Sequence, residues 1–153
     1  MSAADRPVLR VVAGALFDED GRVLIAERPA GRSLAGRWEF PGGKVGQAES
    51  DFAALRRELR EELGIELLAS EELGSLLHDY GDRSVELHCH CVLHWTGTPR
   101  ALDGQRLRWV ALSELHNAGL LEADRPFVEA LQRRGAPAPR RRTIAAARPE
   151  NTR

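Results

Sequence analysis

The first forty residues predict two paired strands and a loop. Residues 8–17 (VLRVVAGALF) are mostly apolar and rich in Val, Leu and Ala, as in a strand buried along most of its length. The tetrapeptide DEDG at residues 18–21 is a hairpin-turn signal, so residues 22–28 are expected to return as a second strand. A loop containing Gly and Ala follows at residues 29–36, and residues 38–40 form a short extended piece.

A helix is predicted over about residues 50–63, after a backbone corner at Pro41-Gly42-Gly43 that no helix crosses. Gly64 follows the last helical residue and is the expected stop. One stripe of apolar residues recurs at i, i+3, i+7 and i+11 and is expected to face the core. Its members are Phe52, Leu55, Leu59 and Leu63.

The second half of the chain predicts further strands and a closing helix. Extended segments are expected near residues 66–68, 73–80, 84–95 and 107–110. Residues 125–134 (RPFVEALQRR) predict a helix with a proline in its first turn. Strands and helices are mixed without a regular βαβ rhythm, which favours an α+β fold or an α/β/α sandwich around a mixed sheet.

Length and composition indicate an ordinary globular protein. The chain has 153 residues, of which 42% are hydrophobic and 29% charged. Its two cysteines, Cys89 and Cys91, are too few for a disulfide framework. The first ten residues lack the apolar core of a signal peptide, and no stretch approaches the ~20 apolar residues of a membrane span. We therefore expect a reduced, cytoplasmic protein with no membrane partner.

The net charge of −1 is distributed unevenly. Residues 133–153 contain seven arginines and one acid, a net charge of +6, so residues 1–132 carry −7. The negative charge of residues 1–132 suits a protein that binds cations, and it argues against binding of nucleic acid by this part of the chain. Residues 1–134 are therefore expected to form the folded domain. Residues 135–153 are expected to form a disordered basic tail, the one segment that could contact nucleic acid or a partner protein.

Three carboxylates crowd the last turns of the predicted helix. Glu58, Glu61 and Glu62 precede its stop, where the helix dipole is negative, and Glu58 and Glu62 form a like-charge pair at i, i+4 that costs about a few tenths of a kcal/mol. The three lie on one face about 100° wide and offer oxygen ligands to a hard cation such as Mg²⁺ or Mn²⁺. The alternative is a solvated charged face, with Arg57 and Arg60 as counterions.

The spacing of these residues resembles that of the Nudix box. The resemblance extends to WEFPGGK at residues 38–44 and ADRP at residues 123–126, which are similar to the MutT-type branch, and it covers about residues 8–134. So many fixed positions make a chance match improbable. The matching positions are Gly43, Glu49, Arg57, Glu58, Leu59, Glu61, Glu62, Gly64 and Ile65.

The resemblance implies a Nudix fold, with a mixed sheet between helices and the box as a loop-helix-loop. It implies an enzyme that uses Mg²⁺ or Mn²⁺ to cleave a nucleoside diphosphate linked to another group. The implied metal ligands are Glu58, Glu61, Glu62 and the Gly42 carbonyl. The implied supporting residues are Arg57, which would orient the glutamates, and Gly43, Glu49 and Gly64, while Lys44 would meet phosphate. Capping of the helix would alone explain Glu49.

Hydrolysis of a triphosphate needs an activated water and neutralisation of the charge on the leaving pyrophosphate, which metal ions supply. A carboxylate then takes the proton of the water. The resemblance implies attack on the β-phosphorus, giving a nucleoside monophosphate and pyrophosphate. Glu58 is the first candidate for the base. Asp103 is the second, because it matches a Glu that many MutT-like proteins place in this loop, although Asp is shorter by a methylene.

Substrate choice must come from outside the box. Asp124 of ADRP stands where MutT enzymes selective for 8-oxo-dGTP carry Asn, and Asp is also found there in the CTP pyrophosphohydrolase branch. An ionised Asp only accepts hydrogen bonds, which suits the N–H groups of guanine or the amine of cytosine. Asp124 could instead cap the helix entered at Pro126. Other positions where the family contacts the nucleotide are Arg28, Glu39, Tyr80 and Arg83.

The run LHCHCVLH at residues 87–94 raises a zinc hypothesis. In a strand Cys89 and Cys91 share one face while His88 and His90 share the other, so the four cannot converge on one ion. We expect ordinary strand packing. Besides the enzyme, two other functions remain open: a Nudix-fold module that binds a nucleotide without turnover, and a domain docked through its basic tail. Retention of every box glutamate argues against the first of these.

Overall fold

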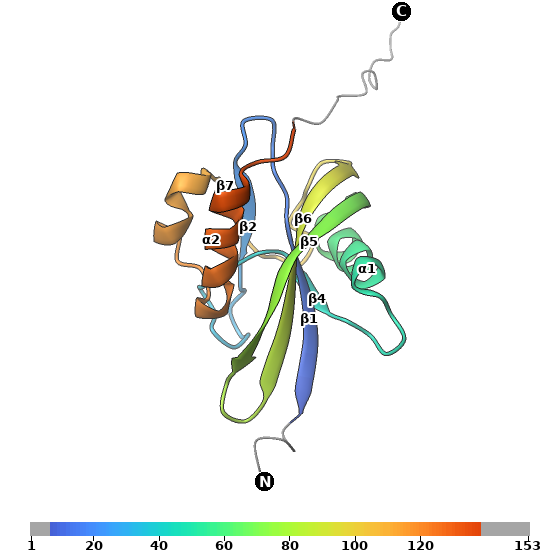
Figure 1. The fold of residues 1–153 in the computed structure, drawn as a ribbon, viewed down its shortest axis with the longest axis vertical. Helices are drawn as coiled ribbons and strands as arrows, with labels where there is room; N and C mark the ends of the chain where they lie inside the picture. Colours follow the sequence, from blue (N-terminus) through green and yellow to red (C-terminus); the bar gives the residue numbers. More distant parts are fainter. Residues whose placement is uncertain (1–6, 139–153) are drawn as a thin grey trace, which may run out of the picture.

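The computed structural model describes residues 7–138 (Figure 1). The strands are β1 (Val8–Ala15), β2 (Val23–Glu27), β3 (Trp38–Glu39), β4 (Gly42–Lys44), β5 (Glu66–Asp79), β6 (Ser84–Thr96) and β7 (Leu107–Val110). The helices are α1 (Asp51–Leu63) and α2 (Arg125–Arg134), with 3-10 turns η2 (Leu112–Asn117) and η3 (Glu122–Asp124). Most of the predicted basic tail, residues 139–153, lies outside the described residues.

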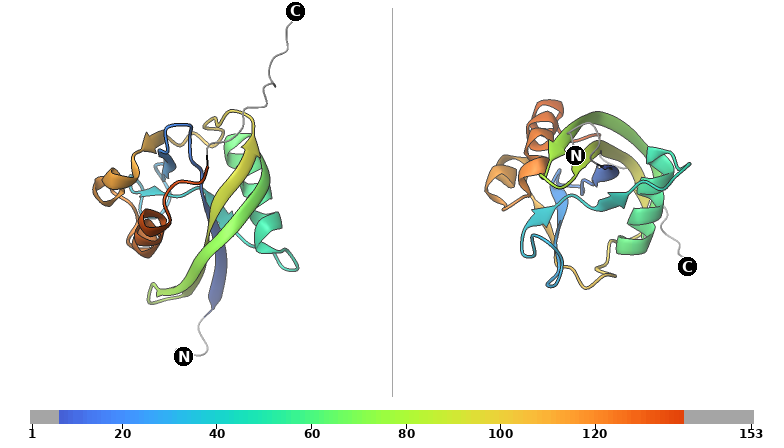
Figure 2. Two further views of the ribbon diagram at one scale, coloured as in Figure 1. Left: turned by 45° about the horizontal axis from the view of Figure 1, so that its top comes forward. Right: turned by 90° about the horizontal axis from the view of Figure 1, so that it is seen from below.

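Two sheets form the centre of the fold, and the helices lie on opposite sides of it (Figures 1 and 2). The larger sheet has the order β4-β1-β6-β5 and is mixed, because β1 and β6 run parallel from the Val8–Ser84 pair to the Ala15–Cys91 pair while its other pairs are antiparallel. The predicted α+β fold is confirmed. The smaller antiparallel sheet, β3-β2-β7, is an addition to the single mixed sheet that was expected.

One strand prediction was wrong in detail. The two extended segments expected after α1 form the single strand β5, which pairs with β6 along its whole length. The register of this pairing shifts at Leu67/Ala69, Ala69/Ser70 and Glu72/Gly74. Such irregularities bend a strand without ending it. The polar residues between the two predicted segments therefore stay in the sheet, because their backbone groups are paired with β6.

Local signals determine both ends of α1. The Ser50 Oγ accepts a hydrogen bond from the Ala53 N–H at 3.1 Å, which makes Ser50 the N-cap. Gly64 adopts the left-handed conformation with φ of 71° and donates its N–H to the Arg60 carbonyl, as a C-terminal stop does. Of the predicted apolar stripe, Phe52 is only half-buried, because it lies in the first turn at the edge of the core. The buried members are Leu55, Leu59 and Leu63.

The mixed sheet separates two hydrophobic cores. One core packs under α1 around Leu55, Leu59 and Val92, and the other packs under α2 around Phe127 and Leu131. Burial of one large apolar side chain contributes about 1.5–3 kcal/mol to the stability of the fold. The buried side chains of the two cores therefore hold both helices on the sheet. Within residues 7–138, no helix is long and apolar enough to cross a membrane.

Residues of β6 face these two cores in alternation, as predicted. Cys89 and Cys91 are buried free thiols in the core under α2. His88 and His90 lie on the opposite face, toward the start of α1. The prediction that the cysteines and histidines cannot share one ion is therefore confirmed for this strand.

Candidate active site

A cavity of about 680 Å³ opens between the two sheets, within the size range of small-molecule sites. It brings together most of the residues predicted to bind substrate or metal, from six separate parts of the chain. Those that line it are Arg28, Glu39, Gly42, Gly43, Lys44, Glu62, Tyr80, Arg83, Asp103 and Asp124. The other predicted residues do not line it, and these are Glu49, Arg57, Glu58, Glu61 and Gly64.

Arg57 connects the loop before α1 to the helix itself. Its Nε and Nη2 donate to the two carboxylate oxygens of Glu49, at 2.8 and 2.9 Å, and its Nη1 donates to Glu58 Oε2 at 2.8 Å. Glu49 also accepts from the Gly46 N–H at 2.7 Å. These bonds, first of all those from Arg57, lower the pKa of Glu49 to about 2. Glu49 does not cap α1, because Ser50 does so, and its side chain is occupied by Arg57.

The Gly42-Gly43 corner allows a close approach of three elements. A side chain at Gly42 would overlap the Val12 carbonyl oxygen of β1, and one at Gly43 would overlap the carboxyl group of Glu58 on α1. The backbone of β1 therefore excludes any side chain at Gly42, whereas a side chain at Gly43 would require the Glu58 carboxyl group to move away. The corner thus brings the backbone of β4 next to the carboxyl group of Glu58 on the helix.

Four carboxylates gather where α1 meets the cavity: Glu39, Glu58, Glu62 and Asp103, here called the acidic group. Burial first, and then the charge and hydrogen bond of Glu58, raise the pKa of Glu62 well above its ordinary value, with smaller contributions from Glu39 and Asp103. Carboxylates this close need either a shared proton or a cation between them. Their oxygen-only donor set fits Mg²⁺ or Mn²⁺.

Glu61 differs from its two box neighbours. Its side chain is 59% exposed, and its Oε1 lies 3.6 Å from Arg57 Nη1. It lies on the same face of α1 as Glu58 and Glu62 but does not line the cavity. The structure therefore brings Glu58 and Glu62 together and leaves Glu61 at the solvent edge of the same face.

Asp124 is a buried carboxyl group at the cavity wall. It accepts a hydrogen bond from the Phe40 N–H at 3.4 Å. Burial, followed by the negative charge of Glu39, raises its pKa to about 7. Asp124 stands at the N-cap position of α2 but makes no capping hydrogen bond, so the capping alternative is wrong. Its side chain is instead directed at the cavity side of the fold.

The remaining predicted nucleotide contacts surround the same cavity. Arg28 donates to Glu39 Oε1 at 2.9 Å and to the Ser33 carbonyl at 2.7 Å, so its guanidinium is held in place. Burial raises the pKa of Glu39 despite this pairing. The Tyr80 ring packs edge-on against His78, with 4.5 Å between the ring centroids, and is 40% exposed.

Gln105 is a residue of this site that sequence reasoning missed. It is buried, lines the cavity, and donates from Nε2 to the Glu62 carbonyl at 3.2 Å. Its Oε1 accepts from the Asp103 N–H at 2.9 Å. Gln105 thus fixes the loop that carries Asp103 to the end of α1. Its only sequence signal was its place in the segment LDGQ.

Comparison with known proteins gives a family match over most of the chain. The family model described as "NUDIX domain" matches residues 12–130. The CTP pyrophosphohydrolase of Escherichia coli is 43% identical over 119 residues, which cover 78% of this chain and 88% of that protein. A protein named putative 8-oxo-dGTP diphosphatase 2 from Mycobacterium tuberculosis is 42% identical over 126 residues, covering 80% and 87% of the two chains.

Solved structures show the same similarity. The E. coli ORF135 protein superposes with a TM-score of 0.76 and 36% identity, covering 99% of this chain and all of that one. A structure from work on MutT of Aliivibrio salmonicida and Vibrio cholerae gives a TM-score of 0.72 and 32% identity, over 82% of this chain and 98% of the other.

Proposed function

Because the chain belongs to the MutT-like branch of the Nudix hydrolase family, enzymes that act on phosphoric anhydrides, we propose that it hydrolyses modified nucleoside triphosphates such as 8-oxo-dGTP to the monophosphate and pyrophosphate. The observation that carries this proposal is a single cavity lined by Glu62 of the acidic group and by the buried Asp124. Glu62 would hold a cation that neutralises the phosphates, and Asp124 offers a polar group to a base. Such an activity would remove damaged nucleotides from the precursor pool.

Hydrolases of this family depend on a divalent metal, and we propose Mg²⁺, with Mn²⁺ as a substitute. The proposed ligands are Glu58, Glu61, Glu62 and the Gly42 carbonyl, and the contact of Gly43 with the Glu58 carboxyl group supports this set. When bound, the metal would lower the pKa of a water molecule and neutralise phosphate charge. The oxygen-only acidic group supports this choice, since a cation between its closely spaced carboxylates would replace the proton that they otherwise share.

The chain's own side chains would orient and deprotonate the water. Glu58 is the proposed base, because Arg57 fixes its carboxylate through Oε2 and because it lies against Gly43. Asp103 is the second candidate, since it lines the cavity and its loop is held beside Glu62 by Gln105. Lys44 and Arg83 line the same cavity and are proposed to contact phosphate and nucleotide.

Asp124 favours a second candidate substrate, a cytidine triphosphate. The CTP pyrophosphohydrolase relative is 43% identical to this chain, and an ionised Asp124 would accept from the amine of cytosine. A neutral Asp124 both donates and accepts, as an amide does, and so would match the edge of an oxidised purine. With a pKa of about 7, the Asp124 side chain exists in both the ionised and the neutral form near neutral pH.

The test is pyrophosphate release with Mg²⁺ across normal, oxidised and 5-substituted nucleoside triphosphates. Preference for 8-oxo-dGTP over dGTP would support the first substrate, and preference for CTP or dCTP the second. The matched control is Glu58→Gln, which keeps the shape of the side chain and removes its charge. If the wild-type chain and this variant released pyrophosphate equally, or if no nucleotide were hydrolysed, the proposal would be overturned.

A further inference from the structure

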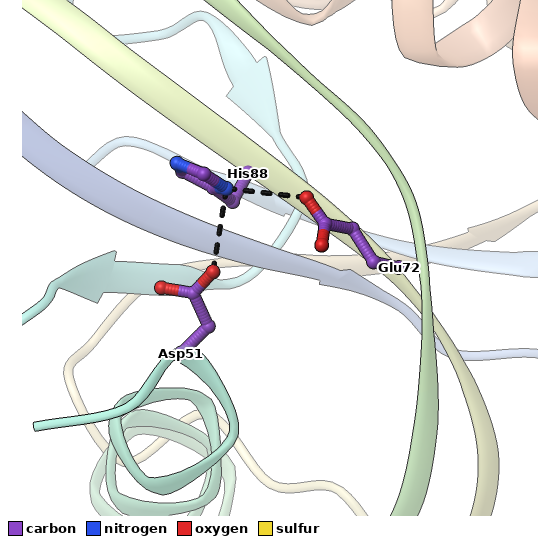
Figure 3. Close-up of side chains that lie close together, drawn as sticks. All are labelled: Asp51, Glu72 and His88. Carbon is purple, nitrogen blue, oxygen red and sulfur yellow. Dashed lines mark hydrogen bonds and ion pairs between the residues drawn. The ribbon is translucent and has the colours of Figure 1, made fainter.

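A second group of metal-ligating side chains lies at the start of α1, away from the cavity. Asp51 comes from the first turn of α1, Glu72 from β5 and His88 from β6, and each offers one ligand atom within 4.8 Å of the other two. Figure 3 shows the His88 ring between the two carboxylates, with its Nδ1 3.3 Å from Asp51 Oδ2 and 3.3 Å from Glu72 Oε2. None of the three lines the cavity.

We propose that Asp51, Glu72, His88 and His90 form a second divalent-cation site, separate from the box, that takes Zn²⁺. The site would hold α1 to the mixed sheet, because its ligands come from one helix and two strands. This inference does not depend on the proposed substrate.

Two of the distances between the ligand atoms already match a small tetrahedral site, and His90 Nε2 would move closer than its present 4.0 Å from Asp51 Oδ2. Bonds of about 2.0–2.2 Å to nitrogen and oxygen place tetrahedral ligands about 3.4 Å apart. The two His88 contacts are both 3.3 Å. A single Nδ1–H of a neutral ring could serve only one of the two carboxylates well, so a further positive charge among them would be favourable.

His90 is the independent observation that points to a ligand. Its side chain is only 9% exposed, and its Nε2 has no hydrogen-bond partner, yet this atom lies 4.0 Å from Asp51 Oδ2. A buried ring nitrogen without a partner costs free energy, which coordination would recover. His88 and His90 share one face of β6, so both can reach the same ion after a small side-chain movement.

Groups around the cluster suit the role of outer supports for metal ligands. The other ring nitrogen of His90, Nδ1, lies 3.1 Å from Ser70 Oγ, and Arg10 Nε donates to Asp51 Oδ1 at 3.0 Å. Glu86 Oε1 lies 3.2 Å from His88 Nε2, within ion-pair distance although not aligned as a hydrogen bond. Ligating histidines commonly place their second nitrogen against such groups.

Two carboxylates and two imidazoles favour Zn²⁺ over Mg²⁺. Imidazole nitrogen suits zinc and its first-row neighbours, whereas Mg²⁺ prefers oxygen ligands only. The two carboxylates also balance the charge of the ion. The box, with oxygen ligands alone, and this cluster would therefore select different metals in one protein.

The experiment measures Zn²⁺ binding to the full chain at pH 8 in excess Mg²⁺, with Glu58→Gln/Glu62→Gln as a background that disables the box. We expect the wild type and this background to retain one Zn²⁺ each. His88→Gln should weaken that binding at least about 100-fold, as loss of a direct ligand exceeds the effect of an outer group. Co²⁺ substitution should give the visible absorption of a tetrahedral site, which His88→Gln removes.

The matched control is His94→Gln, which changes an exposed histidine on the same strand. It should bind Zn²⁺ as the wild type does. If His88→Gln does not fold, Glu72→Gln, at a side chain 49% exposed, replaces it. The site would be overturned if His88→Gln, or Glu72→Gln in its place, bound Zn²⁺ as tightly as the wild type. It would also be overturned if that variant and His94→Gln lost the same amount of Zn²⁺ affinity. Contacts of His88 with Asp51 and Glu72 that hold no metal would give that result.

Discussion

Arg57 donates hydrogen bonds to both carboxylate oxygens of Glu49 and, from its third nitrogen, to Glu58, so one guanidinium connects the loop before α1 to a carboxylate of the acidic group. All three bonds are between 2.8 and 2.9 Å. The fixed fork of donors in arginine makes such a triple attachment feasible, whereas the ammonium group of lysine is a single point.

Arg57→Lys should therefore lower kcat by about 10- to 100-fold with a smaller change in KM, because the carboxylate of Glu58 loses its fixed orientation. Steady-state pyrophosphate release on the preferred substrate measures this. Arg60→Lys is the control, since Arg60 pairs with Glu66 on another side of the same helix. A loss of similar size in both variants would mean that helix stability, and not orientation, is responsible.

Glu61→Gln should lower turnover by orders of magnitude and leave the fold intact, because the side chain is exposed and its proposed role is to bind metal. Turnover at saturating Mg²⁺ and the thermal unfolding midpoint are the measurements. Glu129→Gln, an exposed glutamate on α2, provides the control. Near-normal activity of Glu61→Gln would remove Glu61 from the metal site.

Asp124→Asn should shift preference toward 8-oxo-dGTP and away from CTP, because an amide always offers both a donor and an acceptor. In the wild type the ratio of 8-oxo-dGTP to CTP hydrolysis should fall as pH rises through about 7, where Asp124 ionises. The variant should show no such change. A ratio independent of both pH and this substitution would mean that Asp124 does not read the base.

The stability of the metal-free protein should fall between about pH 4 and pH 7. The pKa of Asp124 rises from its ordinary 3.8 to about 7 on folding, so in this range the folded state binds a proton that the unfolded state releases. The loss is on the order of a few kcal/mol in the free energy of unfolding. Glu62 shifts in the same direction and extends the decline to higher pH.

Urea unfolding at several pH values in EDTA checks this slope, and Asp124→Asn should flatten it over the lower range. Addition of Mg²⁺ should raise stability most at alkaline pH, where Glu62 is ionised and needs a counter-charge. A wild-type protein whose stability rises between pH 5 and pH 7 would contradict the assignment.

Features carried by neighbouring residues could be predicted from the sequence. The helix α1 was predicted at its observed place because its leucine stripe and Gly64 lie within one short segment, although the capping role considered for Glu49 belongs to Ser50. The continuity of β5 could not be predicted, because its middle is kept in the sheet by hydrogen bonds to β6 and not by its own side chains.

The same reason explains which site residues were missed. Gln105 donates to the carbonyl of Glu62, which is distant in the sequence. No local sequence pattern predicts this contact, because it depends on how the fold brings the two segments together. Likewise Asp51 and Glu72 meet His88 only because β5 pairs with β6 and α1 begins beside them. The alternation of side chains along β6 correctly excluded a metal site with four ligands from that strand alone. It could not predict ligands that come from α1 and β5.

The parallel pairing of β1 with β6 has a consequence for the order of folding. The β5–β6 hairpin can form from neighbouring residues, whereas β1 must wait for a strand from the far half of the chain. The glycine corner of β4 pairs with β1, and Val85 and Leu87 of β6 line the same cavity, so the cavity is complete only when β1 and β6 have paired. Recovery of activity during refolding should therefore coincide with the final, slowest step of assembly, after most of the secondary structure has appeared.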